Sequence, residues 1–268
     1  GETIALIFGT SNFEALLTNW ACHAKRIGVR WFALVAMDAQ LHASLLRQPS
    51  LRDHAVLLQN IIGNVNITKL NVIGERQRFG LRVLEQGISV VHTDADALWL
   101  RDPTSLFDGG DVVAERIWGK PLSVVKHWGA AICTGFYFVR STPSTIAIMS
   151  KSVNTIIHKR RTQPSWQASD QWAINHAIND QVVQWESGTT MKPINDFNTK
   201  FYENDSHVGH TKLLRAKFVV LPHVAVARSC PILKHGAAEP PKDEKVERRK
   251  YASRDASRDT PRAESGAR

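Results

Sequence analysis

The 268-residue chain is 43% hydrophobic and 22% charged, which is typical of a globular protein with a large core. It contains no run of about eighteen apolar residues, so we expect no membrane-spanning helix. The formal net charge is +9, but no basic stripe interleaved with aromatic residues and no zinc-finger spacing accompanies it, which argues against nucleic acid as a partner.

The first half of the chain alternates short apolar runs with segments of helical periodicity. Buried strands are predicted over residues 3–8, 31–36 and 88–92. Helices are predicted over residues 13–26, 39–46 and 78–86. Gly28 and Gly87 follow the first and last of these helices as stop signals. Residues 51–62 fit either a helix or a strand, and residues 71–74 fit a loop.

The second half continues the alternation. Strands are predicted over residues 111–115, 131–139, 182–185 and 218–221, and helices over 143–158 and 169–179, with Thr142 as a cap. This order predicts one α/β domain over residues 1–240, with a mainly parallel central sheet flanked by helices. Residues 241–268 read as a basic extension, because residues 240–268 hold nine Lys or Arg and six Asp or Glu. We expect the first part of this extension to close the active site and the remainder to be disordered.

Asp94 and Asp96 stand directly after the apolar run at residues 88–92. Ligands of open α/β sheets bind at the carboxyl ends of the strands. Two carboxylates two residues apart, off regular strand geometry, can converge on a hard divalent cation, which would bridge the two phosphates of a nucleotide sugar. The plain alternative is a solvated turn in which Asp96 caps a following helix.

The residues around this pair resemble a known family. Thr93-Asp94-Ala95-Asp96 with Trp99-Leu100-Arg101-Asp102-Pro103 is similar to the signature of the nucleotide-diphospho-sugar transferases, which include plant and algal arabinosyl-, xylosyl- and galactosyltransferases. Further similar blocks are, in chain order, Asn12-Phe13-Glu14 to Asn19-Trp20 with Arg26-Ile27-Gly28, Leu84-Glu85-Gln86-Gly87, Thr134-Gly135-Phe136-Tyr137-Phe138-Val139-Arg140-Ser141, and Ser169-Asp170-Gln171 with Asn175. The resemblance implies a GT-A-like fold, a UDP-sugar donor, Mn²⁺ or Mg²⁺, and retention of anomeric configuration.

The resemblance also implies roles for individual residues. The metal ligands would be Asp94, Asp96 and His235, with His223 as the competitor of His235. Asp170 and Gln171 would face the donor sugar opposite the diphosphate, although Asp170 could also serve as a helix N-terminal charge. Donor contacts are expected from Thr10, Asn12, Arg76, Arg78, Thr93, Asp94, Ala95, Thr134, Gly135 and Lys242. Helix surface for Arg76 and Arg78, turn chemistry for Thr10 and Asn12, and a solvated tail for Lys242 are the alternatives.

Cys133 departs from the family, whose members usually carry Asn before the Thr-Gly of this strand. A side-chain amide that could hold a sugar hydroxyl is therefore missing, and the identity of the donor stays open. The spacing from His235 to Lys242 fits the family, although the residues between them differ.

The sequence thus predicts a metal-dependent, retaining glycosyltransferase that moves a pentose or galactose from a UDP-sugar to a hydroxyl of a glycan or glycoprotein. The alternatives are a metal-dependent nucleotide phosphohydrolase or nucleotidyltransferase, and a catalytically degenerate sugar-binding protein. We expect the luminal part of a Golgi protein with one membrane anchor, absent from this chain, and a cytoplasmic location is the alternative.

Overall fold

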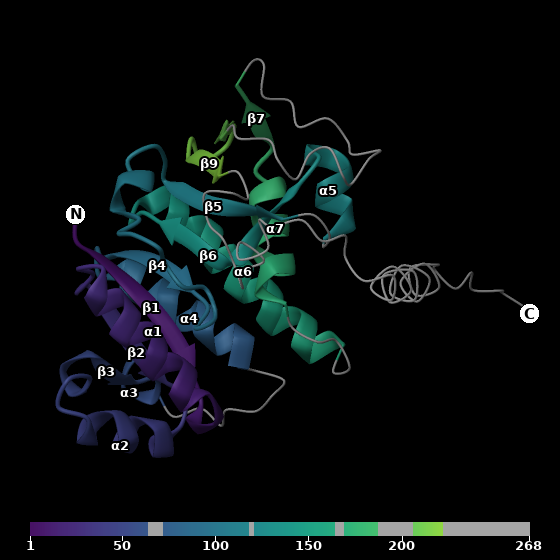
Figure 1. The fold of residues 1–268 in the computed structure, drawn as a ribbon. Helices are drawn as coiled ribbons and strands as arrows, with labels where there is room; N and C mark the ends of the chain where they lie inside the picture. The colour runs from purple at the N-terminus through teal and green to yellow at the C-terminus, as the bar shows by residue number, and fades with distance from the viewer. Residues whose placement is uncertain (64–71, 118–120, 164–168, 187–205, 222–268) are drawn as a thin grey trace, which may run out of the picture. The chain divides into compact units, whose positions relative to one another are not determined.

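A computed structural model describes residues 1–63, 72–117, 121–163, 169–186 and 206–221 (Figure 1). The chain divides into two compact units, Gly1–Ser229 and Cys230–Arg268, and every described residue belongs to the first. The domain boundary expected at residue 240 and the extension over residues 241–268 lie outside the described residues and stay predictions. Within the described ranges, no helix is long and apolar enough to cross a bilayer.

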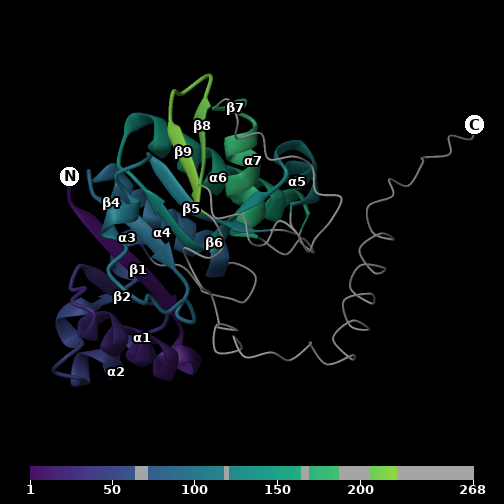
Figure 2. The same cartoon turned by 45° about the horizontal axis from the view of Figure 1, so that its top comes forward.

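Nine strands of the described residues form one sheet in the order β3-β2-β1-β4-β6-β5-β9-β8-β7 (Figure 2). They are β1 (Thr3–Gly9), β2 (Phe32–Ala36), β3 (Ala55–Leu57), β4 (Ser89–Thr93), β5 (Val112–Ile117), β6 (Ala131–Val139), β7 (Val183–Trp185), β8 (His207–Thr211) and β9 (Lys217–Leu221). Neighbours are parallel from β3 to β4 and between β5 and β9. The other neighbours are antiparallel.

Helices cover both faces of the sheet (Figures 1 and 2). They are α1 (Glu14–Arg26), α2 (Ala39–Arg47), α3 (Gln59–Ile62), α4 (Val72–Glu85), α5 (Leu122–Trp128), α6 (Pro143–Thr162) and α7 (Asp170–Asn179), with short 3₁₀ turns at Ser11–Phe13, Arg52–His54 and Thr104–Leu106. Alternate strand residues enter two core clusters: in β1, Leu6 and Phe8 join one cluster and Ala5 and Ile7 the other. The first cluster includes residues of α4, α6 and α7, and the second includes residues of α1 and α2. Burial on both faces explains why the strands read as continuous apolar runs.

The prediction of a single α/β layered domain is confirmed, and most predicted strands and helices are present within one or two residues of their expected bounds. The expectation of a mainly parallel sheet was too simple, because β6 runs antiparallel to both β4 and β5. Strand direction leaves no trace in apolar periodicity when both faces of the sheet are buried.

Residues 72–74, expected in a loop, form the first turn of α4. Their Asn-Val-Ile-Gly context resembles a turn, but Gly74 packs against α6, where an added Cβ would come within 3.0 Å of Ile156 Cγ2. Close helix packing therefore explains this glycine. The sequence analysis also missed α5 and β8. The polar sequence of β8 hides its alternation, in which His207, Gly209 and Thr211 are buried.

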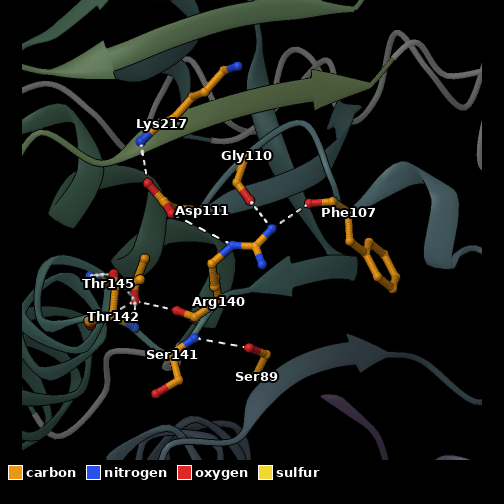
Figure 3. A network of polar contacts seen from close by, with 9 residues as sticks. All are labelled: Ser89, Phe107, Gly110, Asp111, Arg140, Ser141, Thr142, Thr145 and Lys217. Atoms are coloured by element: carbon orange, nitrogen blue, oxygen red, sulfur yellow. Dashed lines mark hydrogen bonds and ion pairs between the residues drawn. The ribbon is translucent and has the colours of Figure 1, made fainter. Parts of the chain in front are cut away.

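A polar junction fixes the amino end of β4 and the carboxyl end of β6 (Figure 3). The Arg140 guanidinium donates to the carbonyls of Phe107 and Gly110 at 2.9 and 3.3 Å and lies 3.8 Å from Asp111. Asp111 accepts the Lys217 backbone N–H at 2.9 Å. This junction stabilises the end of the strands opposite to Asp94. β4 begins at that end, and its last residue, Thr93, directly precedes Asp94.

Candidate active site

The carboxyl ends of β1 and β4 carry the candidate site. The two strands are parallel, with Ile7 opposite Thr93, so the residues that follow them meet at one edge of the sheet. A cavity of about 350 Å³ opens there. Its polar lining comes from Thr10, Arg76, Asp94 and Asp96. The remaining lining residues are Phe8, Gly9, Phe13, Leu16, Met37, Val72 and Ala95.

The turn that presents Asp94 and Asp96 is anchored on both sides. The Asp94 backbone N–H donates to the Gly135 carbonyl on β6 at 2.9 Å, and Ala97 N–H donates to the Asp94 carbonyl at 3.0 Å. The Trp20 indole on α1 donates to the Ala97 carbonyl at 3.1 Å. These bonds leave the Asp96 side chain exposed. Asp96 caps no helix, because residues 97–103 contain none, and the helix-cap interpretation was wrong.

Arg76 joins the turn to α4. Its Nη2 lies 3.0 Å from Asp94 Oδ1, and the two side chains are only 19% and 31% exposed. Burial by itself would lower the pKa of Arg76, but the nearby carboxylates of Asp170 and Asp94 outweigh burial and raise that pKa. The guanidinium is therefore a permanent positive charge at the cavity wall.

Asp170 opens α7 and lies beside Arg76. Its Oδ1 accepts the Thr134 hydroxyl at 3.1 Å and the Gln171 backbone N–H at 2.8 Å. Burial raises the pKa of the Asp170 carboxyl, and the Arg76 charge opposes that rise. Asp170 also directly follows Ser169, the N-cap of α7, so its charge lies at the N-terminus of this helix, as the alternative interpretation predicted. Asp170 does not line the cavity. Its charge acts on Arg76, which also interacts with Asp94.

An aromatic stack underlies this ion cluster. His92 stacks on Tyr137 with ring centroids 4.7 Å apart and on Phe8 at 5.7 Å. Arg76 lies over the Phe8 ring at 5.3 Å from its centroid. Burial, with a smaller contribution from Arg76, lowers the pKa of His92 to about 3, so the imidazole is neutral at physiological pH. Burial also raises the pKa of Tyr137 well above its ordinary value, and Asp170 adds to that rise.

The structure thus brings Thr10, Arg76, Asp94, Ala95 and Asp96 to one cavity. Thr134, Gly135 and Asp170 connect to that cavity through hydrogen bonds and charge. Thr93 is fully buried, and its hydroxyl accepts the Trp99 indole N–H at 3.3 Å. Gln171 contributes its backbone N–H to Asp170.

Asn12 and Arg78, which were also predicted as donor contacts, are not among the residues that line the cavity. Asn12 is exposed in the 3₁₀ turn. Arg78 pairs with Glu75 at 3.2 Å and donates to the Ile62 carbonyl at 3.2 Å. Residues two apart on a helix point to nearly opposite sides, so Arg76 and Arg78 cannot share one site. Arg78 therefore contacts residues outside the cavity lining, and its role as a donor contact stays a prediction.

Cys133 is buried in β6, where its Sγ accepts the Gly135 backbone N–H at 3.4 Å. His223, His235 and Lys242 lie outside the described residues. No group of three or more His, Cys, Asp or Glu side chains suited to a metal occurs within the described part of the chain. Asp94 and Asp96 nevertheless give one cavity two carboxylates, the ligand type that Mn²⁺ and Mg²⁺ prefer. The residues present fit such an ion.

Two residues near the cavity, Phe13 and Gln77, were not predicted from the sequence. Phe13 is 52% exposed on the cavity rim, an unusual position for a phenylalanine. In the sequence, the position of Phe13 directly after a cluster of turn-forming residues was the pattern that could have indicated this role. The buried Gln77 amide donates to the Asp170 carbonyl at 3.3 Å and accepts from Ser152 at 2.7 Å. It thereby fixes α7 against α4 beside Arg76, a role that no sequence pattern indicates.

A profile of the nucleotide-diphospho-sugar transferase family matches residues 28–230, about three quarters of the chain. The chain belongs to this family. It is 26% identical over 164 residues to the beta-arabinofuranosyltransferase RAY1 of Arabidopsis thaliana, covering 57% of this chain and 30% of that protein. It is 34% identical over 86 residues to a UDP-galactose:fucoside alpha-3-galactosyltransferase of Dictyostelium discoideum, covering 31% and 13%.

Among solved structures, the galactosyltransferase LgtC in complex with donor and acceptor sugar analogs aligns with a TM-score of 0.44 and 13% identity. That alignment covers 64% of this chain and 69% of LgtC. The matches to the curated relatives span about a third of their length or less.

Proposed function

We propose that this nucleotide-diphospho-sugar transferase is a metal-dependent glycosyltransferase that moves a pentose or galactose from a UDP-sugar to a hydroxyl of a glycan or glycoprotein. The observation that carries the proposal is the single cavity lined by Asp94, Asp96 and Arg76 at the carboxyl ends of β1 and β4. Paired carboxylates and a fixed guanidinium suit a divalent cation with a diphosphate. The names of the plant and Dictyostelium relatives support arabinose and galactose as the first donors to test.

Each residue has a role in this proposal. Asp94 and Asp96 hold the cation, which would neutralise charge on the departing diphosphate. His235 and donor phosphate oxygens would complete the coordination, and Lys242 would meet the diphosphate. Thr10 and Phe13, which line the same cavity, would contact the nucleotide base. Catalysis then depends mainly on positioned charge.

Retention of configuration is part of the proposal. A retaining transfer requires a covalent intermediate on a carboxylate or departure and attack on one face of the sugar. Asp170 is the carboxylate beside Arg76 that suits stabilisation of an oxocarbenium-like state, and Gln171 adjoins it. The anomeric configuration of the new glycosidic bond, read by NMR of the product and compared with that of the donor, tests this point directly, and an inverted product would contradict it.

The direct test is a donor screen that measures released UDP with and without Mn²⁺ and with and without sugar acceptors. Acceptor-stimulated UDP release that requires the metal is the expected result. Cleavage without any acceptor that gives UMP and a sugar phosphate would favour the nucleotide phosphohydrolase, and binding without release would favour the degenerate sugar-binding protein. We place the protein in the Golgi lumen, and fractionation that recovers it from the cytosol would contradict this location.

Replacing Asp96 gives a sharper prediction. Asp96→Ala should abolish metal-dependent UDP binding and transfer while leaving the melting temperature without ligand unchanged, because the side chain is exposed. Asp108→Ala, at another exposed aspartate outside the cavity, is the matched control and should bind UDP normally. A drop of many degrees in the ligand-free melting temperature of Asp96→Ala would mark the carboxylate as structural.

A further inference from the structure

Arg76 lies between two carboxylates that have different tasks in the proposed reaction. It contacts Asp94 at 3.0 Å, a proposed metal ligand, and its charge acts on Asp170, the carboxylate at the start of α7. The three groups come from the carboxyl end of β4 and from two helices, α4 and α7. One guanidinium therefore compensates the charge of both carboxylates in the protein without ligand.

Among the described residues of this region, carboxyl groups outnumber cations. Asp94, Asp96 and Asp170 supply three carboxyl groups, and Arg76 is the cation that the described residues place on the cavity wall. The oxygen of Asp94 that accepts from Arg76 is one that a metal ion would compete for. The buried Nε of Arg76 has no hydrogen-bond partner among the described residues. A movement of the side chain away from Asp94 would therefore free N–H donors for an incoming anion.

The support beneath Arg76 limits where its side chain can go. The Phe8 ring lies 5.3 Å from the guanidinium carbon, and Phe8 is itself stacked on His92. Cation–π attraction to Phe8 favours positions of the guanidinium over the cavity floor, between Asp94 and Asp170. A rotation of the side chain over this ring would exchange Asp94 for another anion.

We propose that Arg76 is a latch on the metal site. Without ligand it forms an ion pair with Asp94, and its release from Asp94 to the donor diphosphate couples metal binding to donor binding. This inference rests on the proposed metal-dependent use of a UDP-sugar. It makes Arg76 a donor-binding residue that weakens the binding of metal alone and strengthens the binding of metal together with nucleotide.

Thermodynamic linkage predicts two measurable effects of removing Arg76. If Arg76 opposes metal binding in the absence of nucleotide, its removal tightens metal binding. If the released guanidinium then meets the diphosphate, its removal also reduces the factor by which UDP and metal enhance each other's affinity. A side chain with a purely structural role would produce neither change.

The experiment measures Mn²⁺ affinity by electron paramagnetic resonance on the full chain, with and without UDP. Without UDP, Arg76→Gln should bind Mn²⁺ about fivefold more tightly than wild type or better, and the enhancement by UDP should shrink by a similar factor. Arg82→Gln removes the same charge from an exposed position of α4, where Arg82 pairs with Glu85 at 2.8 Å, and should behave as wild type. Arg76→Lys keeps the charge without the planar fork and should fall between wild type and Arg76→Gln.

Asp170 keeps its hydrogen bonds from Thr134 and Gln171 in Arg76→Gln, which favours a folded variant, and its melting curve checks this. If that variant does not fold, the sign of the change in Arg76→Lys decides. Unchanged or weaker Mn²⁺ binding without UDP, or an unchanged enhancement by UDP, overturns the latch while leaving the proposed function intact. No Mn²⁺ binding by any chain, with or without UDP, overturns the latch and the metal dependence together.

Discussion

His92 is a buried, neutral imidazole directly beneath the ion cluster. Its ring is stacked between Phe8 and Tyr137, and its Nε2 has no hydrogen-bond partner among the described residues. A charged imidazolium here would be desolvated and would face Arg76, so the folded protein excludes it. The residue behaves as an aromatic spacer that separates Phe8 from Tyr137 and supports Arg76.

This arrangement predicts a dependence of stability on pH. The pKa of His92 is about 3 in the folded protein against 6.5 in the unfolded chain, so the unfolded chain takes up a proton first as the pH falls. Above pH 6.5, His92 is neutral in both states and does not reduce the free energy of unfolding. Below pH 6.5, the free energy of unfolding falls by up to about 1.4 kcal/mol for each pH unit. His92→Phe keeps the stack and should lose less stability between pH 6.5 and 4 in urea unfolding without metal. Parallel pH curves for the two proteins would contradict this prediction.

At the scale of elements, α4 matters most for the site. It carries Arg76 to the cavity, and Gln77 ties it to α6 and α7. It approaches the sheet so closely at Gly80 that an added Cβ would lie 2.3 Å from His92 Nε2. The glycine therefore sets the distance between α4 and β4, and so the height of Arg76 above the stack.

Gly80→Ala should consequently destabilise the protein although alanine favours helices. Overpacking a buried contact costs about 1–3 kcal/mol, against a gain in helix propensity of about 1 kcal/mol. UDP affinity in Mn²⁺ should also fall, because displacing His92 displaces Phe8 and Arg76. Gly74→Ala is the matched control on the same helix, since its Cβ meets a movable methyl of Ile156 at 3.0 Å. Equal unfolding free energies of the two variants would contradict the proposed role of Gly80.

At the scale of the whole molecule, the nine-stranded sheet places the parallel strands β1 and β4 next to the antiparallel strand β6. Asp94 is at this change of direction, where the Gly135 carbonyl of β6 holds its backbone. The family profile ends at residue 230, one residue past the boundary between the two compact units. His235 and Lys242 fall in the second unit.

The contribution of that second unit can be measured by truncation. A chain ending at Tyr251 should bind UDP in Mn²⁺ as the full chain does, because the proposed ligands His235 and Lys242 are kept. A chain ending at Lys234 should lose metal-dependent UDP binding. Isothermal titration of both chains is the measurement. Undiminished binding by the shorter chain would refute the assignments of His235 and Lys242 and make His223 the next residue to replace.

The sequence by itself determined the α/β class, most strands and helices, and the placement of Asp94 and Asp96 after a buried strand. These features follow from local periodicity and from the rule that ligands bind at strand carboxyl ends. It also supported membership in the family through several blocks in the right order.

Only the tertiary structure decided which charges meet. Arg76 and Arg78 were equal candidates in the sequence, and the helix rotates one to Asp94 and the other to Glu75. The link between Arg76, Asp94 and Asp170 joins residues up to 94 positions apart and depends on how α4 and α7 pack on the sheet. Strand direction, the neutral state of His92 and the closeness of Gly80 have the same origin. Each is set by contacts between segments distant in the chain, and local residue patterns do not record such contacts.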